Sequence, residues 1–561
     1  MKLRRSSMFA ALSLAVVVQA TLMPLAVPAG AASRSFDTER IRQLVRNRLV
    51  LPRFAYSGGV RGWLNAPEPG DQELPRALTP SIGTNVDAND PSRDLGGGQS
   101  ETAIAASGDR VVVAWNDASG FLAPPGSTLP SLSGVSISSD GGKSFHDLIG
   151  LPNVEQNQSW SGDPMVASID HDHFVVGGLY FPSNVASCKD GPIRATMALT
   201  VGTVTNGGSS MSFADPVQPV ESGNLCGRRP PRSAGLLDKE FVAYDPVSRT
   251  IAISYTRYFF FGKHSGLGQI EVVIATVPSD PTQLSADDFR RVRVWEEEGF
   301  CNFPDELPSE ATQCNAQNAG AYPAVAPNGD VYVAWERNID TLLFFGDPFA
   351  YEHAAVVPAG TSAPSAGGRG DPVVITLGQA NSNASGGVHS LNAQAIAGFN
   401  RGLGNDFPRI AFDPAGDRVV FVWNDASLHP LGDIWLRTSA PGLLALSPIR
   451  KINDDVSFAL HFMPAVSVGT DGSIRTSWYD RRTAGGDSAE TDYVGEIRPS
   501  EGVDTTDFVV STGSTDWIGA SSLIVPNFGD YTDNFTTGTT TYYVWSDGRL
   551  GVPQPMVDSH P

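Results

Sequence analysis

The stretch "PRIAFDPAGDRVVFVWND" (408–425) predicts two short strands joined by a turn. Short apolar runs, Ile410–Phe412 and Val419–Trp423, lie on both sides of Ala415-Gly416-Asp417, and the second run is followed by Asn424-Asp425. Alternation with a period of two places every second side chain on one sheet face, and Gly beside Asp between two such runs favours a hairpin turn. The stretch therefore indicates an amphipathic hairpin that ends in an aromatic residue and a polar cap.

The same design occurs in six other segments, so that the chain carries seven copies. They are "ETAIAASGDRVVVAWND" (101–117), "DPMVASIDHDHFVVGGLYF" (163–181), "KEFVAYDPVSRTIAISYTR" (239–257), "YPAVAPNGDVYVAWERN" (322–338), "MPAVSVGTDGSIRTSWYDRR" (463–482) and "GDYTDNFTTGTTTYYVWSDGR" (529–549). The intervals between copies leave room for two more strands, as in "GDIWLRTSA" (432–440) and "DYVGEIRPS" (492–500).

Four antiparallel strands per repeat, copied seven times, are typical of a β-propeller. A sheet of this size cannot bury both faces alone, and stacking it between neighbours in a closed ring also removes most exposed edges. We therefore predict an all-β fold, a seven-bladed β-propeller of four-stranded antiparallel blades over 95–561. A six-bladed propeller and a pair of β-sandwiches are the alternatives.

Composition narrows the class of protein. The chain has 561 residues, 18% of them charged, with 58 Gly, 41 Pro and a net charge of −21. This indicates a loop-rich globular protein. An acidic surface repels phosphate backbones and anionic lipids, which argues against nucleic acid and membrane surfaces as partners. The sequence does not indicate an oligomeric state.

The N-terminus resembles an export signal. Lys2, Arg4 and Arg5 precede an apolar run that ends in small residues near Ala29-Gly30-Ala31. This pattern predicts a signal peptide over 1–31, with a retained anchor as the alternative, and no later apolar run is long enough to span a bilayer. A short helix and a Pro/Gly-rich leader are expected over 32–94, and the mature protein is expected to be secreted.

Four cysteines are consistent with an exported chain. An even number in an oxidising compartment favours disulfides, and three pairings of four cysteines are possible. Cys301–Cys314 would close a short loop, which leaves Cys188–Cys226 as the second pair. Zinc is the alternative, but the spacings do not match a CxxC site.

One turn carries a family resemblance. The stretch "SISSDGGKSFHDL" (136–148) contains Ser138, Asp140, Gly142, Ser144 and Phe145 in the order of an Asp-box, the bacterial neuraminidase repeat of the sialidase-like superfamily. The resemblance implies a hairpin between the third and fourth strands of a blade, in which Asp and Ser satisfy turn N–H groups and Phe145 is buried between sheets. It is a structural motif. "TNGGSSMSF" (205–213) resembles a degraded second copy.

The same resemblance implies a ligand site at the central channel, where sialidases hold a sugar carboxylate with three arginines and use a Tyr nucleophile, a Glu and an Asp. This chain departs from that pattern at the first arginine, where Ser100 or Glu101 stands. A Glu repels a carboxylate, which argues against ordinary sialidase activity. The closest match, Arg409 in "FPRIAF", lies in the fifth copy and out of order.

Polar residues at the openings of first strands and the ends of second strands are the candidate site. Residues that recur in many copies favour contacts between blades, whereas single-copy residues favour function. The candidate catalytic residues are Glu101, Asp163, Asp238, Asp530 and Tyr531. The candidate ligand-binding residues are Lys239, Arg257, Arg337, Arg409, Arg482 and Arg549, and the polar caps also include Asp117, Asp425, Asp480, Arg481 and Asp547.

No metal site or cofactor is predicted. "DHDH" (170–173) is interpreted as a solvated turn, and "WEEEGF" (295–300) as a loop with a possible Ca²⁺ contact. Recognition of an extracellular glycan or other polymer at the channel face is the leading hypothesis. A glycoside hydrolase that uses the channel carboxylates and arginines is the main alternative, and a protein-binding scaffold is the third. Paired carboxylates beside a Tyr or Arg would favour the enzyme, and complete pairing of channel charges would favour the scaffold.

Overall fold

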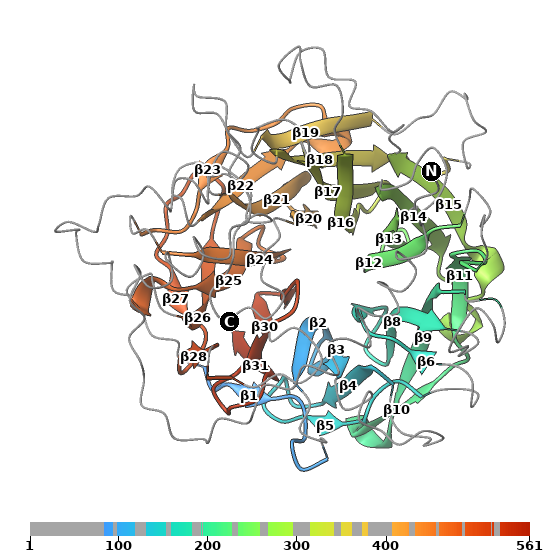
Figure 1. Ribbon diagram of the computed structural model, residues 1–561, viewed down its shortest axis with the longest axis horizontal. Coiled ribbons are helices and arrows are strands. Elements are labelled where there is room, and N and C mark those ends of the chain that lie inside the picture. The colour runs from blue at the N-terminus through green and yellow to red at the C-terminus, as the bar shows by residue number, and fades with distance from the viewer. Residues whose placement is uncertain are drawn as a thin grey trace, which may run out of the picture.

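Seven antiparallel sheets surround a central axis in the computed structural model, which describes residues 83–93, 98–117, 131–152, 159–181, 192, 194–226, 234–258, 268–295, 315–340, 349–361, 373–379, 407–425, 432–455, 459–484, 489–517, 519–520 and 528–561. The ring is plain in Figure 1. The seven-bladed propeller of four-stranded blades predicted from the repeats is confirmed, and the six-bladed and sandwich alternatives are wrong.

The first three blades follow the order of the chain. Blade 1 contains β2 (Gln99–Ser107), β3 (Arg110–Asp117), β4 (Ser133–Ser138) and β5 (His146–Asp147). Blade 2 contains β6 (Ser159–Trp160), β7 (Met165–Ser168), β8 (His173–Phe181), β9 (Thr196–Thr205), β10 (Ser210–Phe213) and β11 (Val217–Glu221). Blade 3 contains β12 (Leu236–Asp245), β13 (Thr250–Tyr258), β14 (Gly268–Thr276) and β15 (Arg290–Trp295). In blade 2 the inner strand is divided into β6 and β7, and the outer strand into β10 and β11.

The remaining blades repeat the arrangement. Blade 4 contains β16 (Asn315–Val325), β17 (Val331–Asp340), β18 (Phe349–Val357) and β19 (Val373–Gln379). Blade 5 contains β20 (Arg409–Asp413), β21 (Arg418–Asp425), β22 (Asp433–Ser439) and β23 (Arg450–Lys451). Blade 6 contains β24 (His461–Val468), β25 (Ile474–Asp480), β26 (Glu490–Arg498), β27 (Phe508–Val509) and β28 (Thr515–Asp516). Blade 7 contains β29 (Asp533–Thr537), β30 (Thr540–Asp547) and β31 (Gln554–His560).

Short 3-10 turns are the helical elements among the described residues. They are η2 (Asn206–Gly208), η3 (Pro281–Gln283), η4 (Ala286–Asp288), η6 (Pro441–Leu443) and η7 (Arg482–Ala484).

The two ends of the described chain close the ring. The fourth strand of blade 7 is β1 (Val86–Asp87), which pairs with β31. The side chain of Asn85 supports this closure because its amide donates to Asp558 and to the carbonyl of Val510 at 2.9 Å each. Residues from the predicted leader thus complete the last sheet and remove an open edge.

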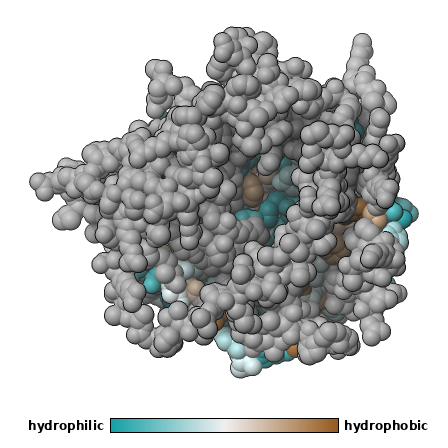
Figure 2. All heavy atoms as spheres, viewed as in Figure 1, coloured by the Kyte–Doolittle hydropathy of each residue, from teal (hydrophilic) through white to brown (hydrophobic). Residues whose placement is uncertain are grey.

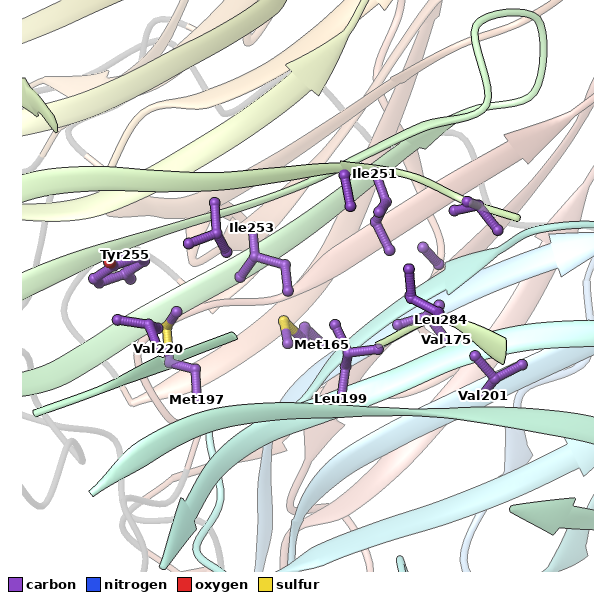
Figure 3. Packing of buried hydrophobic residues seen from close by; sticks show 14 of the residues in the cluster. Met165, Val175, Met197, Leu199, Val201, Val220, Ile251, Ile253, Tyr255 and Leu284 are labelled. Atoms are coloured by element: carbon purple, nitrogen blue, oxygen red, sulfur yellow. The ribbon is translucent and has the colours of Figure 1, made fainter. Parts of the chain in front are cut away.

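The apolar core lies between blades. Each of seven buried clusters joins two neighbouring sheets, and Figure 3 shows the cluster between blades 2 and 3. There Met197 and Leu199 from β9 face Ile253 and Tyr255 from β13. Burial of alternating side chains against the next blade is what the period-two pattern requires.

The turn at 138–145 joins β4 to β5, the third and fourth strands of blade 1. The Ser138 hydroxyl accepts from the Gly142 N–H at 2.9 Å, and Asp140 accepts from the N–H groups of Lys143 and Ser144 at 3.0 Å each. Phe145 packs against the cluster between blades 1 and 7. The local hydrogen bonds and the buried aromatic agree with the predicted structural role.

Several predictions fall outside the described residues. The signal peptide (1–31) and the helix at 37–50 are among them, as are Cys188, Cys301 and Cys314. Cys226 is disulfide-bonded, but the pairing of the four cysteines stays a prediction. No helix within the described segments is long and apolar enough to cross a membrane.

Candidate active site

The single-copy polar residues predicted from the blade openings lie together at one end of the channel. We call this group, with one residue added by the structure, the channel cluster: Glu101, Asp163, Asp238, Lys239, Glu240, Asp530 and Tyr531. Its members come from blades 1, 2, 3 and 7. Figure 2 looks down the same axis and shows hydrophilic described residues, with hydrophobic ones beside them, at the hollow centre.

Lys239 is the hub of the channel cluster. Its Nζ lies 2.8 Å from Asp530 Oδ2, 3.1 Å from Asp163 Oδ2 and 3.8 Å from Asp238 Oδ1. The Lys239 side chain is 10% exposed, whereas that of Asp238 is 30% exposed. Of the three carboxyl groups around Lys239, that of Asp238 is therefore the most accessible to a ligand. Lys239 holds Asp163 and Asp530 more tightly.

Hydrogen bonds from blade 1 position the aspartates. The Asn116 side chain accepts from the Asp163 N–H at 2.7 Å and donates to Glu101. Glu101 in turn accepts from the Asp530 N–H at 3.1 Å. Glu101 is fully buried. Through these hydrogen bonds it links blades 7, 1 and 2 and fixes the position of the two aspartates.

An unusual backbone brings these groups into contact. Glu101, Asp163 and Lys239 have φ values of 53°, 49° and 56°, in the left-handed region that non-glycine residues seldom occupy. Gly529 precedes Asp530 with a φ of 74°, and a Cβ there would lie 2.2 Å from Glu101 Cγ. The same conformation occurs at the blade 6 opening, where Met463 has a φ of 54°, so it is a repeated feature of the blade openings.

The two aspartates from blades 2 and 3 differ in protonation. Burial opposes ionisation of Asp163, but the Lys239 ammonium outweighs it and lowers its pKa well below the usual value. Burial raises the pKa of Asp238 to about 7; Lys239 opposes the rise and the Asp163 charge adds to it. Below neutral pH, Asp238 therefore carries a proton and donates it in a hydrogen bond to ionised Asp163.

Glu240 is the member of the channel cluster that sequence reasoning missed. It is fully buried, and neither carboxyl oxygen has a hydrogen-bond partner beyond its own residue. Burial, with the charges of Asp163 and Asp238, raises its pKa well above the usual value, which favours its protonated form.

A comparison of the blade openings contains the signal for Glu240. Three blades have proline at the equivalent position, two have threonine and one has alanine: Pro164, Pro408, Pro464, Thr102, Thr532 and Ala321. Glu240 is the single charged residue in the series, so an alignment of all seven openings would have singled it out.

Tyr531 contributes a buried phenol whose hydroxyl has no hydrogen-bond partner. Burial and the neighbouring charges, first those of Asp163 and Glu101, raise its pKa well above the usual value. A phenolate nucleophile is therefore disfavoured in this arrangement.

A layer of larger side chains fills the channel next to the cluster. The ring of Phe241 lies 4.1 Å from that of Tyr322 and 4.9 Å from that of Tyr531. The Arg409 guanidinium lies 3.7 Å from the centre of the Tyr322 ring, donates to the Thr532 carbonyl at 2.7 Å and pairs with Asp533 at 2.8 Å. Arg409 of blade 5 thus links blades 4 and 7.

Two other predicted ligand-binding arginines, Arg257 and Arg549, pair with acidic residues outside the channel cluster. Arg257 pairs with Glu271 at 3.2 Å, and Arg549 with Asp547. Arg337 stacks over Trp295 at 5.7 Å.

Arg482 belongs to a separate buried group in blade 6. We call it the Arg482 network: Asp454, Asp455, His461, Asp480, Arg482 and Asp507. Arg482 contacts Asp454 and Asp507 at 2.6 Å each and Asp480 at 2.7 Å. The neighbouring cap residue, Arg481, donates to the Thr491 hydroxyl at 3.0 Å.

Residues repeated at equivalent positions join the blades or close turns. Asn116 and Asn424, both from a Trp-Asn-Asp cap, accept from the first-strand N–H of the next blade, which belongs to Asp163 and Met463 respectively. Trp478 and Trp545 donate to the Asp two positions later, at 3.0 and 2.8 Å. Repetition therefore indicates structure here, and single occurrence indicates the cluster.

No group of three or more His, Cys, Asp or Glu residues in the described part of the chain is arranged to hold a metal ion. The "DHDH" turn forms local pairs, with His171 at 3.0 Å from Asp109 and His173 at 2.9 Å from Asp170. The segment 296–300 lies outside the described residues, so its proposed Ca²⁺ contact stays a prediction.

Comparisons with known proteins return propellers of low similarity. No family model and no curated protein matches the chain. The α-L-arabinofuranosidase of Fusarium graminearum is 11% identical, with 88% of this chain and 98% of that chain covered and a TM-score of 0.38. The α-L-arabinanase of Penicillium chrysogenum is 10% identical, with 86% and 98% covered and a TM-score of 0.39.

A Trypanosoma rangeli sialidase is 10% identical, with 86% of this chain and 58% of that chain covered and a TM-score of 0.40. At this level of likeness the comparisons carry no functional argument. The propeller assignment rests on the seven sheets, and the function has to be argued from the channel cluster.

Proposed function

We propose that the protein hydrolyses a glycan at the channel face, with Asp238 as proton donor. The observation that carries the proposal is the contact between two carboxyl groups of opposite protonation, Asp238 with a pKa raised to about 7 and ionised Asp163. Carboxyl groups whose pKa values are pushed apart by their surroundings are typical of acid–base sites.

Asp530 is the second carboxylate of the proposed mechanism. It shares the Lys239 ammonium with Asp238, at 2.8 and 3.8 Å respectively, so the two carboxyl groups lie close enough to act on one substrate. Asp238 would protonate the leaving oxygen, and Asp530 would stabilise the positive charge that develops on the sugar or activate a water molecule. Because the Tyr531 phenol resists ionisation, a carboxylate is the better choice for this role.

We propose an extracellular carbohydrate as the binding partner and secretion as the fate of the protein. A protonated Asp238 side chain that is partly accessible to solvent could donate its proton to the glycosidic oxygen of an extracellular carbohydrate polymer. The basic and apolar N-terminus supports secretion. The hydrogen bonds of the 138–145 turn support its assignment as an Asp-box of the sialidase-like superfamily.

The test compares the wild-type protein with Asp238→Asn on aryl glycosides and glycan polymers, with release of reducing sugar as the readout. General-acid catalysis contributes roughly 10²–10⁴-fold, so kcat should fall by about that factor. Activity should decline above pH 7, where Asp238 loses its proton. Asp215→Asn, at an exposed site, is the matched control. No turnover by the wild type, or equal rates for both variants, would contradict the proposal.

Glycan binding without hydrolysis is the second candidate. The ion pairs of Lys239 with Asp163 and Asp530 favour it, because they occupy carboxylates that a hydrolase would use. In that case the wild type would bind glycans and release no product, and Asp238→Asn would leave binding nearly unchanged.

A further inference from the structure

The channel cluster has more carboxyl groups than cations. Its described members include five carboxyls, those of Glu101, Asp163, Asp238, Glu240 and Asp530, and one ammonium, that of Lys239. Lys239 is the cation that opposes the raised pKa values of Asp238 and Glu240. Once two of the five carboxyls are ionised, the cluster is negatively charged.

Three arginines that could offset this charge are engaged by other groups. Arg409 is held by Asp533 and the Thr532 carbonyl. Four acidic residues hold Arg482, and Glu271 holds Arg257, which is 1% exposed. Recognition of a sugar carboxylate depends on a guanidinium that can form two parallel hydrogen bonds to it. These three side chains are not placed to do so.

Solvent screens the charges around Asp238 only weakly. The side chains of Asp163, Lys239 and Asp530 are 10 to 11% exposed, so their charges are weakly screened. An anionic group near Asp238 would meet Asp163 and Asp530 on one side. Such a group would also raise the pKa of Asp238 further, because a like charge disfavours ionisation.

We propose that the channel site selects sugar units without an anionic group and rejects uronic and sialic acids. The inference rests on the proposed function, because it takes the channel cluster as the place where sugar binds. It concerns the class of sugar and leaves the identity of the ring open. Hydroxyl groups are suitable ligands for such a cluster, since each can donate to a carboxylate and accept from the Lys239 ammonium.

The experiment uses pairs of aryl glycosides that differ only at C6: glucoside with glucuronide, and galactoside with galacturonide. The uncharged member of a cleaved pair should have a kcat/KM at least tenfold higher, a difference of about 1.4 kcal/mol. A glycan array with neutral and acidic members measures binding separately from turnover. Amine-bearing sugars should bind at least as well as neutral ones, because a cation is attracted to a negatively charged cluster.

The pH dependence adds a second readout. Rejection of acidic glycans should be stronger at pH 8 than at pH 5, because Asp238 becomes ionised between them. In Asp238→Asn, the rejection measured on the array at pH 8 should fall to the wild-type level at pH 5. Asp215→Asn should leave the pH dependence unchanged.

The outcomes separate the two proposals. Turnover or tight binding of acidic sugars in preference to their neutral counterparts overturns the selectivity and leaves hydrolysis standing. Binding of neutral sugars without turnover supports the selectivity and contradicts hydrolysis. Binding of neither kind overturns both.

Discussion

The channel cluster and the Arg482 network contain the same kinds of group and balance them differently. In the Arg482 network, a guanidinium and an imidazole face four carboxyls, and Arg482 contacts each of them within 3.7 Å. In the channel cluster, one ammonium faces five carboxyls, and Glu240 is left with no partner beyond its own residue.

The difference indicates two uses of buried charge. A network in which every carboxyl group contacts a cation stabilises the position of loops, here those before β24 and after β25. A group in which one buried carboxyl, that of Glu240, has no such contact costs stability, and such costs are typical of sites that bind or react. The predictions below compare the two regions by removing the central cation of each.

Arg482→Met should have the largest effect. Arg482 is 1% exposed, and its loss leaves Asp454 and the carboxylate of Asp480 buried without their cation. Breaking a buried ion pair by removal of one partner costs about 3–5 kcal/mol. The measurement is urea unfolding at pH 7. Arg93→Met is the control, because its pair with Asp147 is 3.9 Å long and the Arg93 side chain is 40% exposed. Loss of less than about 1 kcal/mol, the usual worth of a surface pair, would show that the network is not structural.

Lys239→Met should cost less and should depend on pH. Without the ammonium, burial is no longer outweighed, so the pKa of Asp163 rises and this carboxyl can take up a proton. We expect a loss of about 2–3 kcal/mol at pH 8 and roughly half as much at pH 5. Urea unfolding at both pH values measures it, with exposed Lys143→Met as the control. Equal losses of unfolding free energy at the two pH values would mean that Asp163 does not take up a proton when the Lys239 ammonium is removed.

The fold and half of the site could be predicted from local pattern. The hairpin at 408–425 and its six copies predict a ring, because the apolar face of each sheet is buried only against the next sheet. The seven buried clusters between blades confirm this. Asp163, Asp238 and Asp530 were predicted as single-copy residues at first-strand openings, and the structure brings all three to Lys239.

The rest depends on contacts that local pattern does not contain. Arg482 was predicted to bind ligand because it caps a second strand, but its partners Asp454 and Asp507 lie 28 and 25 residues away in the sequence. The closure of blade 7 by β1 joins residues at opposite ends of the described chain. The role predicted for each arginine stays a prediction, and the geometry favours structural contacts for Arg257, Arg409 and Arg482.

The last prediction concerns His461 and the change in the free energy of unfolding per pH unit. Burial opposes the charged imidazole, but the carboxylates of Asp480 and Asp455 outweigh it and raise the pKa of His461 to about 9. The Nδ1 atom lies 2.8 Å from the Gly432 carbonyl, so the proton on that nitrogen also has an acceptor. The folded protein therefore holds a proton that the unfolded chain releases above about pH 6.5.

The sign of the slope follows from this linkage. The stabilisation by His461 is complete below about pH 6.5 and is lost as pH rises toward 9, at about 1.4 kcal/mol per pH unit. His461→Gln should remove this component of the slope, whereas His146→Gln, an exposed residue of β5, should leave it unchanged. Urea unfolding at half-unit intervals of pH measures both. If the slope survived in His461→Gln, the proton would reside elsewhere, and the Arg482 network would lose the second cation on which its contrast with the channel cluster depends.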